Sequence, residues 1–233
     1  MAGTFCAADA SAQVSLNGEW SPRYHEDFPD RIPGPELGDY TGLPITEGAR
    51  RSADSWDASR LSLPEHQCKV HISPYIYHGP LQYRFTEDRD LRTQRVIAIK
   101  QYVNTFEMER TIWMDGREHP PAWAPATWAG FSTGRWEGDV LVVTTTSLND
   151  QTWLDRAGNH HSNKLKVTER FTLLGPNHIW YEATLDDPLT YSRPWTLEMP
   201  LYRLVEKNAH LLEHKCVPFA DMLLYQDLLL PKK

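Results

Sequence analysis

The 233-residue sequence is poor in cysteine and has no long apolar run. Its three cysteines, Cys6, Cys68 and Cys216, lie far apart and form no Cys-x-x-Cys pair, which argues against a zinc knuckle or a thioredoxin-type centre. Cys68 and Cys216 could form a disulfide in an oxidising compartment, but two separate small apolar side chains are the favoured interpretation. No stretch reaches the roughly 18 apolar residues that a membrane-spanning helix needs, so no membrane partner is expected.

Basic residues are also in deficit: 24 Lys and Arg face 31 Asp and Glu, which gives a net charge of -7. There is no basic stripe, so nucleic acid is not expected as the main partner. No phosphate-cradling loop, no dinucleotide fingerprint and no metal-binding histidine spacing occurs, and we therefore expect no cofactor and no metal. Internal repeats are absent as well.

Aromatic residues, in contrast, are abundant, with 9 Trp, 10 Tyr and 7 Phe. Such side chains fill the cores of β proteins and also line pockets for flat organic ligands. The length fits one large β domain.

Residues 14–80 are rich in proline and glycine, which excludes long helices and regular central strands. Because the stretch also carries many Trp and Tyr residues, we predict an ordered wrap packed on a scaffold. Within it, Thr46–Arg60 is predicted to be a helix. Residues 1–13 are predicted to be flexible. They resemble the tail of a signal peptide without its body, which favours a cytoplasmic location, with the periplasm as the alternative if a leader was removed.

From residue 81 onward the pattern changes to short runs typical of strands, separated by turn signals such as Asp115-Gly116. The resulting prediction is an all-β, mainly antiparallel, lipocalin-like barrel of roughly eight strands over residues 81–217, in a single domain of residues 14–233. A sandwich is the alternative. Residues 218–233 form a C-terminal segment, with a helix or edge strand at Met222–Leu230. The predicted strands are Gln82–Thr86, Val96–Val103, Thr105–Met114, Phe131–Trp136, Val140–Thr146, Lys164–Leu174, His178–Leu185 and Trp195–Val205, with a short one at His210–Cys216.

The densest polar segment follows Trp113, where Asp115, Arg117 and His119 crowd a turn and the adjoining strand end. At a barrel mouth these three side chains could converge, with Arg117 binding an anion and His119 moving a proton. A turn at Asp115-Gly116 with Arg117 paired to a carboxylate is the plainer interpretation.

Two further positions stand out for their chemistry. His160 and His161 are adjacent, so on a strand only one of them would face inward, and a solvent-exposed loop is the default. Glu169 shares the face of Val167 and Phe171 on an apolar strand. A carboxylate there must be paired or have a raised pKa, and an internal salt bridge is the favoured interpretation.

Two other segments carry residues of possible functional types. Gly130-Phe-Ser-Thr-Gly134 matches the Gly-x-Ser-x-Gly of esterases, but a second strand follows it in place of the required helix, so a serine hydrolase is not expected. In the wrap, His71, Tyr75 and Tyr77 could form a lid over the barrel, although packing tyrosines are the plainer interpretation.

Five motifs stand in order along the chain: Ile112–Pro121, Gly130–Thr144, His161-Ser162, Glu169–Phe171 and Asp187-Pro188. Together they resemble a large bacterial family that is common in soil and sphingomonad-type bacteria. The likeness covers residues 14 to about 220, and its members often carry a secretory leader. The family pattern Gly-x-Pro-His-Ser has His160 in place of Pro here, which leaves the role of His161 open. The chain is similar to proteins encoded among genes for the breakdown of lignin-derived aromatic dimers, a setting in which cofactor-independent lyases and decarboxylases occur.

These observations lead to two hypotheses. The first is a cofactor-independent lyase, of decarboxylase type, for a small aromatic acid: Arg117 holds the carboxylate or phenolate, His119 or His161 exchanges the proton, and Asp115 or Glu169 orients the imidazole. The second is a non-catalytic carrier of an apolar or aromatic molecule. A homodimer stays open. The expected substrate-binding residues are His71, Tyr75, Tyr77, Trp113, Trp128 and Trp136.

Overall fold

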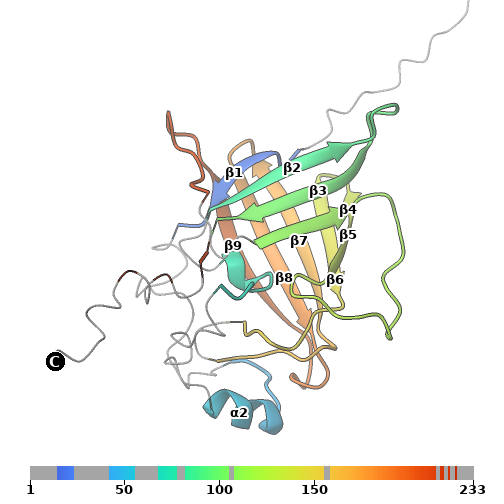
Figure 1. Cartoon of the computed structure of the whole chain (residues 1–233), viewed down its shortest axis with the longest axis vertical. Coiled ribbons are helices and arrows are strands. Elements are labelled where there is room, and N and C mark those ends of the chain that lie inside the picture. The colour runs from blue at the N-terminus through green and yellow to red at the C-terminus, as the bar shows by residue number, and fades with distance from the viewer. Residues whose placement is uncertain are drawn as a thin grey trace, which may run out of the picture.

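The computed structural model describes residues 15–23, 42–55, 68–77, 82–104, 108–154, 158–213, 216–217, 220 and 224. Within these ranges the chain forms a closed barrel of nine strands whose order around the barrel follows the sequence (Figure 1). The predicted all-β barrel is therefore confirmed. The predictions for residues 1–13 and for most of the C-terminal segment lie outside the described residues, as does the end of the predicted helix.

The strands match most of the predicted runs, and two of them, Val96–Val103 and Val140–Thr146, have the predicted bounds. The first strand, a four-residue segment inside the predicted wrap, was missed, and the described residues of His210–Cys216 form no strand. The strands are β1 (Gly18–Ser21), β2 (Tyr83–Arg89), β3 (Val96–Val103), β4 (Met108–Trp113), β5 (Phe131–Glu137), β6 (Val140–Thr146), β7 (Lys166–Gly175), β8 (His178–Asp186) and β9 (Trp195–Arg203). The helices are α2 (Glu47–Asp54), with Thr46 as its N-cap, and the 3-10 turn η3 (Tyr75–Tyr77).

Alternation along each strand determines which side chains fill the barrel. On β7, Val167, Glu169 and Phe171 are buried, while Arg170 between them reaches outward to Glu137. The neighbouring strand β8 repeats the pattern, with alternate residues buried. Since side chains of a strand point alternately to the two faces, the inner residues form one continuous apolar core.

One pair of neighbouring strands departs from the meander expected from consecutive hairpins. β4 and β5 are parallel, with Ile112 opposite Ser132 and Trp113 opposite Thr133. A parallel pair needs a long connection back to the other end of the barrel, and residues 114–130 provide it (Figure 1). His119 joins this connection to the barrel strands: its Nδ1 lies 2.7 Å from Thr146 Oγ1 and its Nε2 lies 2.8 Å from Thr133 Oγ1.

The described residues 42–55 and 68–77 of the wrap lie at the end of the barrel where β5, β7 and β9 begin, which we call the wrap end. The segment before α2 is bonded to the β8–β9 loop through Thr46 N and Thr190 O, at 2.9 Å, and through Ser192 N and Pro44 O, at 2.8 Å. Figure 1 shows α2 below the strands at this end, with η3 in teal closer to them. Residues 68–77, which we call the plug segment, carry η3 and contribute Ile72, Ile76 and Tyr77 to the buried core.

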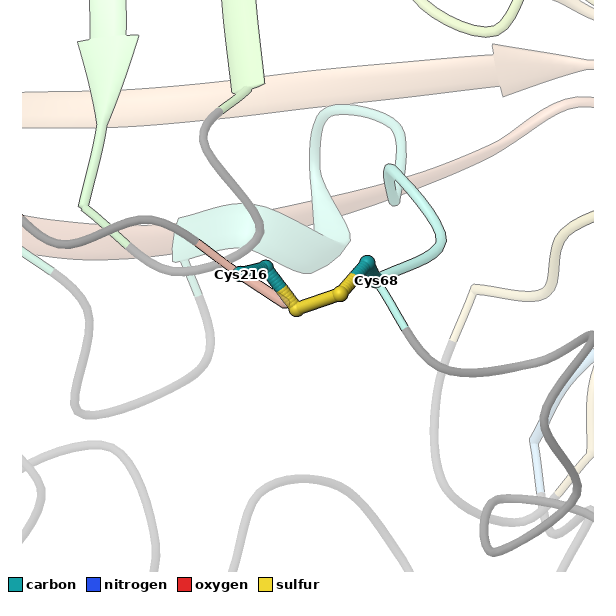
Figure 2. Close-up of a disulfide and its surroundings, with 2 residues drawn as sticks. All are labelled: Cys68 and Cys216. Carbon is teal, nitrogen blue, oxygen red and sulfur yellow. A yellow bond between two sulfur atoms is a disulfide. The ribbon is translucent and has the colours of Figure 1, made fainter. Parts of the chain in front are cut away.

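A disulfide between Cys68 and Cys216 ties the plug segment to the C-terminal part of the chain (Figure 2). Their Cα atoms are 5.6 Å apart, within the usual range, and 148 positions separate them in sequence. The favoured interpretation of two separate cysteines is therefore wrong. Nothing local in the sequence indicates the pairing, because it depends on the whole barrel bringing distant segments together.

The esterase-like Gly130–Gly134 motif has a structural explanation. Gly130 has a φ of +69°, and a Cβ on Gly134 would lie 2.6 Å from Met114 Sδ and 2.9 Å from Ile112 Cγ2. Gly134 is thus required where β5 packs closely beside β4. Ser132 is buried and its Oγ lies 2.8 Å from Thr145 Oγ1. A threonine hydroxyl is not a general base, so Ser132 is not arranged as a nucleophile.

The close packing of Gly134 gives the first prediction. We expect Gly134→Ala to lower the free energy of unfolding by about 1 to 3 kcal/mol, because the added methyl group overpacks the contact with Ile112 and Met114. Gly175→Ala is the matched control: a Cβ there meets no atom within 4 Å, so the change should stay within about 0.5 kcal/mol. Urea unfolding followed by Trp fluorescence measures both. Equal effects in the two variants would contradict the packing argument.

Candidate functional site

An ion pair lies inside the barrel between Arg110 on β4 and Glu169 on β7. Arg110 Nη1 is 2.6 Å from Glu169 Oε2, and Nη2 is 3.3 Å from Oε1, so the contact is bidentate. The side chains are 2 % and 0 % exposed, respectively. The internal salt bridge favoured from the sequence for Glu169 is confirmed.

Neutral hydroxyl groups complete the hydrogen bonding of this carboxylate. The Ser73 hydroxyl of the plug segment donates to Glu169 Oε1, and the Tyr181 hydroxyl of β8 donates to the same oxygen at 3.0 Å. Burial acts to lower the pKa of Arg110, but the nearby charge of Glu169 outweighs it and raises that pKa above its ordinary value. Burial also raises the pKa of Tyr181, so the phenol stays protonated as a donor. The result is a compensated pair of fixed charges.

Beside this pair, polar atoms of Gln101 and Arg110 are left without partners. Gln101 on β3 lies opposite Arg110 in the β3–β4 register and is 1 % exposed. Among the residues that the structure describes, neither Gln101 Nε2, Gln101 Oε1 nor Arg110 Nε has a hydrogen-bond partner. The Gln101 amide faces the Tyr77 hydroxyl group, yet no hydrogen bond of normal geometry joins them. Buried polar groups are almost always paired, and leaving one unpaired costs about 1 to 3 kcal/mol, so these three atoms are exceptional within the core.

Aromatic rings pack around these polar groups. The Tyr77 ring lies 4.4 Å from the Tyr181 ring and 5.0 Å from the Tyr83 ring, centroid to centroid. Phe171 continues the cluster, 5.0 Å from Tyr181 and 5.8 Å from Phe85. The pairs are tilted or edge-on, the arrangements that aromatic rings prefer.

A second cluster lies at the wrap end, around His71 and His161. The His71 ring is 4.5 Å from Tyr75 and 4.8 Å from Trp153. Burial lowers the pKa of His71 to about 4, and the charges of Lys69 and His161 add to this effect. Both histidine rings are therefore neutral near pH 7, because burial lowers the pKa of His161 as well.

His161 is held by hydrogen bonds on both ring nitrogens. Its Nδ1 donates to the Ser162 carbonyl at 3.1 Å, so Nε2 accepts from the Thr152 hydroxyl at 2.8 Å. Asp187 then fixes Ser162, accepting from its N at 2.6 Å and from its Oγ at 2.7 Å. The expectation of a solvent-exposed loop fails for His161, which is fully buried, whereas His160 is half-buried.

The polar trio after β4 lies elsewhere. Arg117 Nε donates to Asp115 Oδ1 at 2.9 Å, and its guanidinium stacks on the Trp113 ring, 3.5 Å from the centroid. His119 contacts Thr133 of β5 and Thr146 of β6 and is half-buried on the outer connection. The structure thus pairs Arg117 with Asp115, the plainer of the two interpretations. Among the described residues, no contact joins these three side chains to Glu169 or His161.

The remaining predicted binding residues divide between the two clusters and the surface. Tyr77 lies in the barrel interior and Tyr75 at the wrap end beside His71. Trp136 packs against the core, while Trp128 is partly exposed, 5.9 Å from Lys69 Nζ. Lys69 is equally distant from the Trp153 ring, so the ammonium group lies near both indoles.

Sequence reasoning missed the residues that surround Glu169: Ser73, Gln101, Arg110 and Tyr181. A signal existed for Arg110 and Gln101. Arg110 alternates with Met108 and Ile112 on an apolar face, the same pattern that drew attention to Glu169. Two opposite charges, each on the buried face of its strand, predict a pair across the barrel.

Comparisons with protein-family models, with curated proteins and with solved structures gave no match. Within the part of the chain that the structure describes, no helix is long and apolar enough to cross a membrane. In the same residues, no three His, Cys, Asp or Glu side chains lie together in a group that could hold a metal ion.

The buried pair gives the second prediction. Glu169→Gln keeps the volume but leaves the Arg110 charge uncompensated, so we expect a loss of about 3 to 5 kcal/mol in unfolding free energy. Arg110→Met should cost a similar amount, and the double variant Arg110→Met/Glu169→Leu clearly less than the sum. The control is Glu137→Gln, in exposed pairs with Arg135 and Arg170, where about 0 to 1 kcal/mol is expected. Additive losses in the chemical-denaturation cycle would show that the two charges do not depend on each other.

The depressed pKa of His71 gives the third prediction. The unfolded chain binds a proton near the ordinary pKa of 6.5, whereas the folded protein does so only near 4. Stability is therefore complete above about pH 6.5 and decreases as the pH falls toward 4, by up to about 3 kcal/mol from this residue. We expect His71→Gln to flatten the profile of unfolding free energy between about pH 7 and pH 4.5. The exposed His178, changed to Gln, should leave the profile as it is; an unchanged slope in His71→Gln would refute the assignment.

Proposed function

We propose that the barrel binds a small, uncharged aromatic molecule in its interior and serves as a carrier for it. The observation that carries this proposal is the set of buried, unpartnered polar atoms on Gln101 and Arg110, set among the aromatic rings of the core. Ligand sites of proteins are mostly apolar and contain a few placed polar groups that fix orientation. The barrel interior has this composition.

The charge balance of the interior argues for an uncharged ligand. Arg110 is the cation of a pair whose anion, Glu169, already takes its two terminal nitrogens. A carboxylate ligand beside them would be a buried charge without a counter-ion, which is strongly unfavourable. A hydroxyl or carbonyl group, in contrast, can accept from Arg110 Nε and from the Gln101 amide at no such cost.

The Gln101 amide also offers an acceptor, so a hydroxyl group that donates to it and accepts from Arg110 Nε satisfies both sides. Hydroxylated aromatic molecules are common among lignin fragments. The resemblance to proteins encoded with lignin-catabolism genes therefore supports the same ligand class.

A cofactor-independent lyase of decarboxylase type is the second candidate, favoured by the buried neutral histidines His71 and His161. In such a reaction the carboxylate leaves as carbon dioxide, and the carbon that carried it takes a proton. His161, hydrogen-bonded at both nitrogens, would be the proton-exchanging group in place of His119. Detection of product from a hydroxylated aromatic acid would favour this candidate over the carrier.

The disulfide bears on location. Disulfides persist in oxidising compartments, so the Cys68–Cys216 bond supports the periplasmic alternative over the cytoplasm.

The fourth prediction tests binding. Isothermal titration calorimetry should show that 2-methoxyphenol binds the wild type, while benzoate, an anion at neutral pH, binds at least about tenfold more weakly. Gln101→Leu should weaken phenol binding by about tenfold or more, because it removes one hydrogen-bonding partner. The same change should leave the empty protein equally or more stable, since it replaces unpaired buried atoms with apolar ones.

Thr86→Val, on the exposed face of β2, is the matched control and should change neither quantity. Stronger binding of benzoate than of 2-methoxyphenol would contradict the charge argument. An undiminished affinity of Gln101→Leu for 2-methoxyphenol would show that Gln101 does not contact the ligand.

A further inference from the structure

One ring in the barrel interior does not come from the barrel wall. Tyr77 belongs to η3 in the plug segment, yet it is fully buried and contacts rings of β2, β7 and β8. Its hydroxyl oxygen lies 3.5 Å from Arg110 Nη2. A residue from outside the strands therefore occupies the centre of the proposed ligand site.

The Tyr77 side chain is itself a para-substituted phenol. Its ring is surrounded by Tyr83, Phe171 and Tyr181, and its hydroxyl group faces Arg110 and Gln101. These are the contacts that a phenolic ligand would need. Burial keeps the group uncharged, because it raises the pKa of Tyr77 well above the ordinary value.

We propose that Tyr77 occupies the position of the ligand in the closed protein, and that the ligand is a phenol which takes this position when the plug segment withdraws. This inference rests on the proposed binding function and adds the place of the ring and the competition for it. Ligand and plug segment then exclude each other, and the affinity of the protein for a phenol is reduced by the fraction of molecules that are closed.

Several contacts hold the plug segment in the closed position, in addition to the burial of Ile72 and Ile76 in the core. Ser73 donates to Glu169 and lies 3.2 Å from the Tyr181 hydroxyl oxygen. His71 packs against Trp153, and Cys68 is bonded to Cys216. Withdrawal removes the Ser73 contact, but Glu169 keeps the two nitrogens of Arg110 and the hydroxyl of Tyr181. The carboxylate thus remains paired in the open state.

The disulfide has a particular effect on this competition. A covalent tether at Cys68 keeps the plug segment close to the barrel end, which raises its effective concentration at the site relative to a free phenol. Removing the tether, or the Ser73 contact, should therefore strengthen phenol binding although neither residue belongs to the ligand contacts.

The fifth prediction measures exchange of the plug segment and phenol affinity together. Saturating the wild type with 2-methoxyphenol should increase backbone hydrogen exchange in residues 68–77, whereas ordinary binding would decrease it. Ser73→Ala and the double variant Cys68→Ser/Cys216→Ser should each bind 2-methoxyphenol several-fold more tightly, by about 3- to 30-fold. Thr190→Ala, a buried residue of the β8–β9 loop at the same end, is the control and should leave the affinity unchanged.

The outcomes separate the two proposals. If 2-methoxyphenol binds but residues 68–77 become more protected, or if neither Ser73→Ala nor the cysteine variant gains affinity, the plug inference is wrong and the binding function stands. If 2-methoxyphenol binds neither the wild type nor these variants, the binding function itself is wrong. Tyr77→Phe keeps the ring, so its affinity should change less than that of Ser73→Ala; the opposite order would also overturn the inference.

Discussion

The ion pair of Arg110 and Glu169 is the constraint on which the interior of this barrel depends. Two charges that are almost fully removed from water are tolerated only when each is paired and hydrogen-bonded. The carboxylate meets this requirement with two guanidinium nitrogens and the hydroxyl groups of Ser73 and Tyr181. One of these donors comes from the plug segment, so the pair also determines where residues outside the barrel wall enter it.

Around this ion pair, some buried polar atoms have hydrogen-bond partners and others do not. Glu169 has donors on both oxygens, whereas Arg110 Nε and the Gln101 amide, one strand away, have no partner among the described residues. Because the charges of Arg110 and Glu169 already cancel, a ligand could hydrogen-bond to the unpartnered atoms without carrying a charge of its own. That distinction favours an uncharged guest over the aromatic acid that the polar residues of the sequence first indicated.

Local pattern was enough to predict most strands, since alternation and turn residues act over a few positions. It also identified Glu169, because a carboxylate between Val167 and Phe171 needs a partner. Local pattern gave wrong predictions where the structure depends on how distant strands pair. The parallel β4–β5 pair carries residues 114–130 along the barrel, so Arg117 and His119 reach no interior site. The prediction that Cys68 and Cys216 stay separate was wrong for the same reason. The two cysteines are 148 positions apart, and only the closed barrel brings them together.

The interior of this barrel is filled by residues of two kinds, those of the strands and those of the plug segment. Wall residues such as Phe171 and Tyr181 are held by strand ladders on both sides and cannot leave without unfolding the sheet. Tyr77 and Ser73 have no such ladder, since they belong to a short segment with a single 3-10 turn. The least costly way to open the interior is therefore to move this segment and keep the sheet intact. Any molecule that enters between Arg110, Gln101 and the aromatic wall competes first with Tyr77, and the contacts that Tyr77 makes describe the chemistry that the competitor must offer.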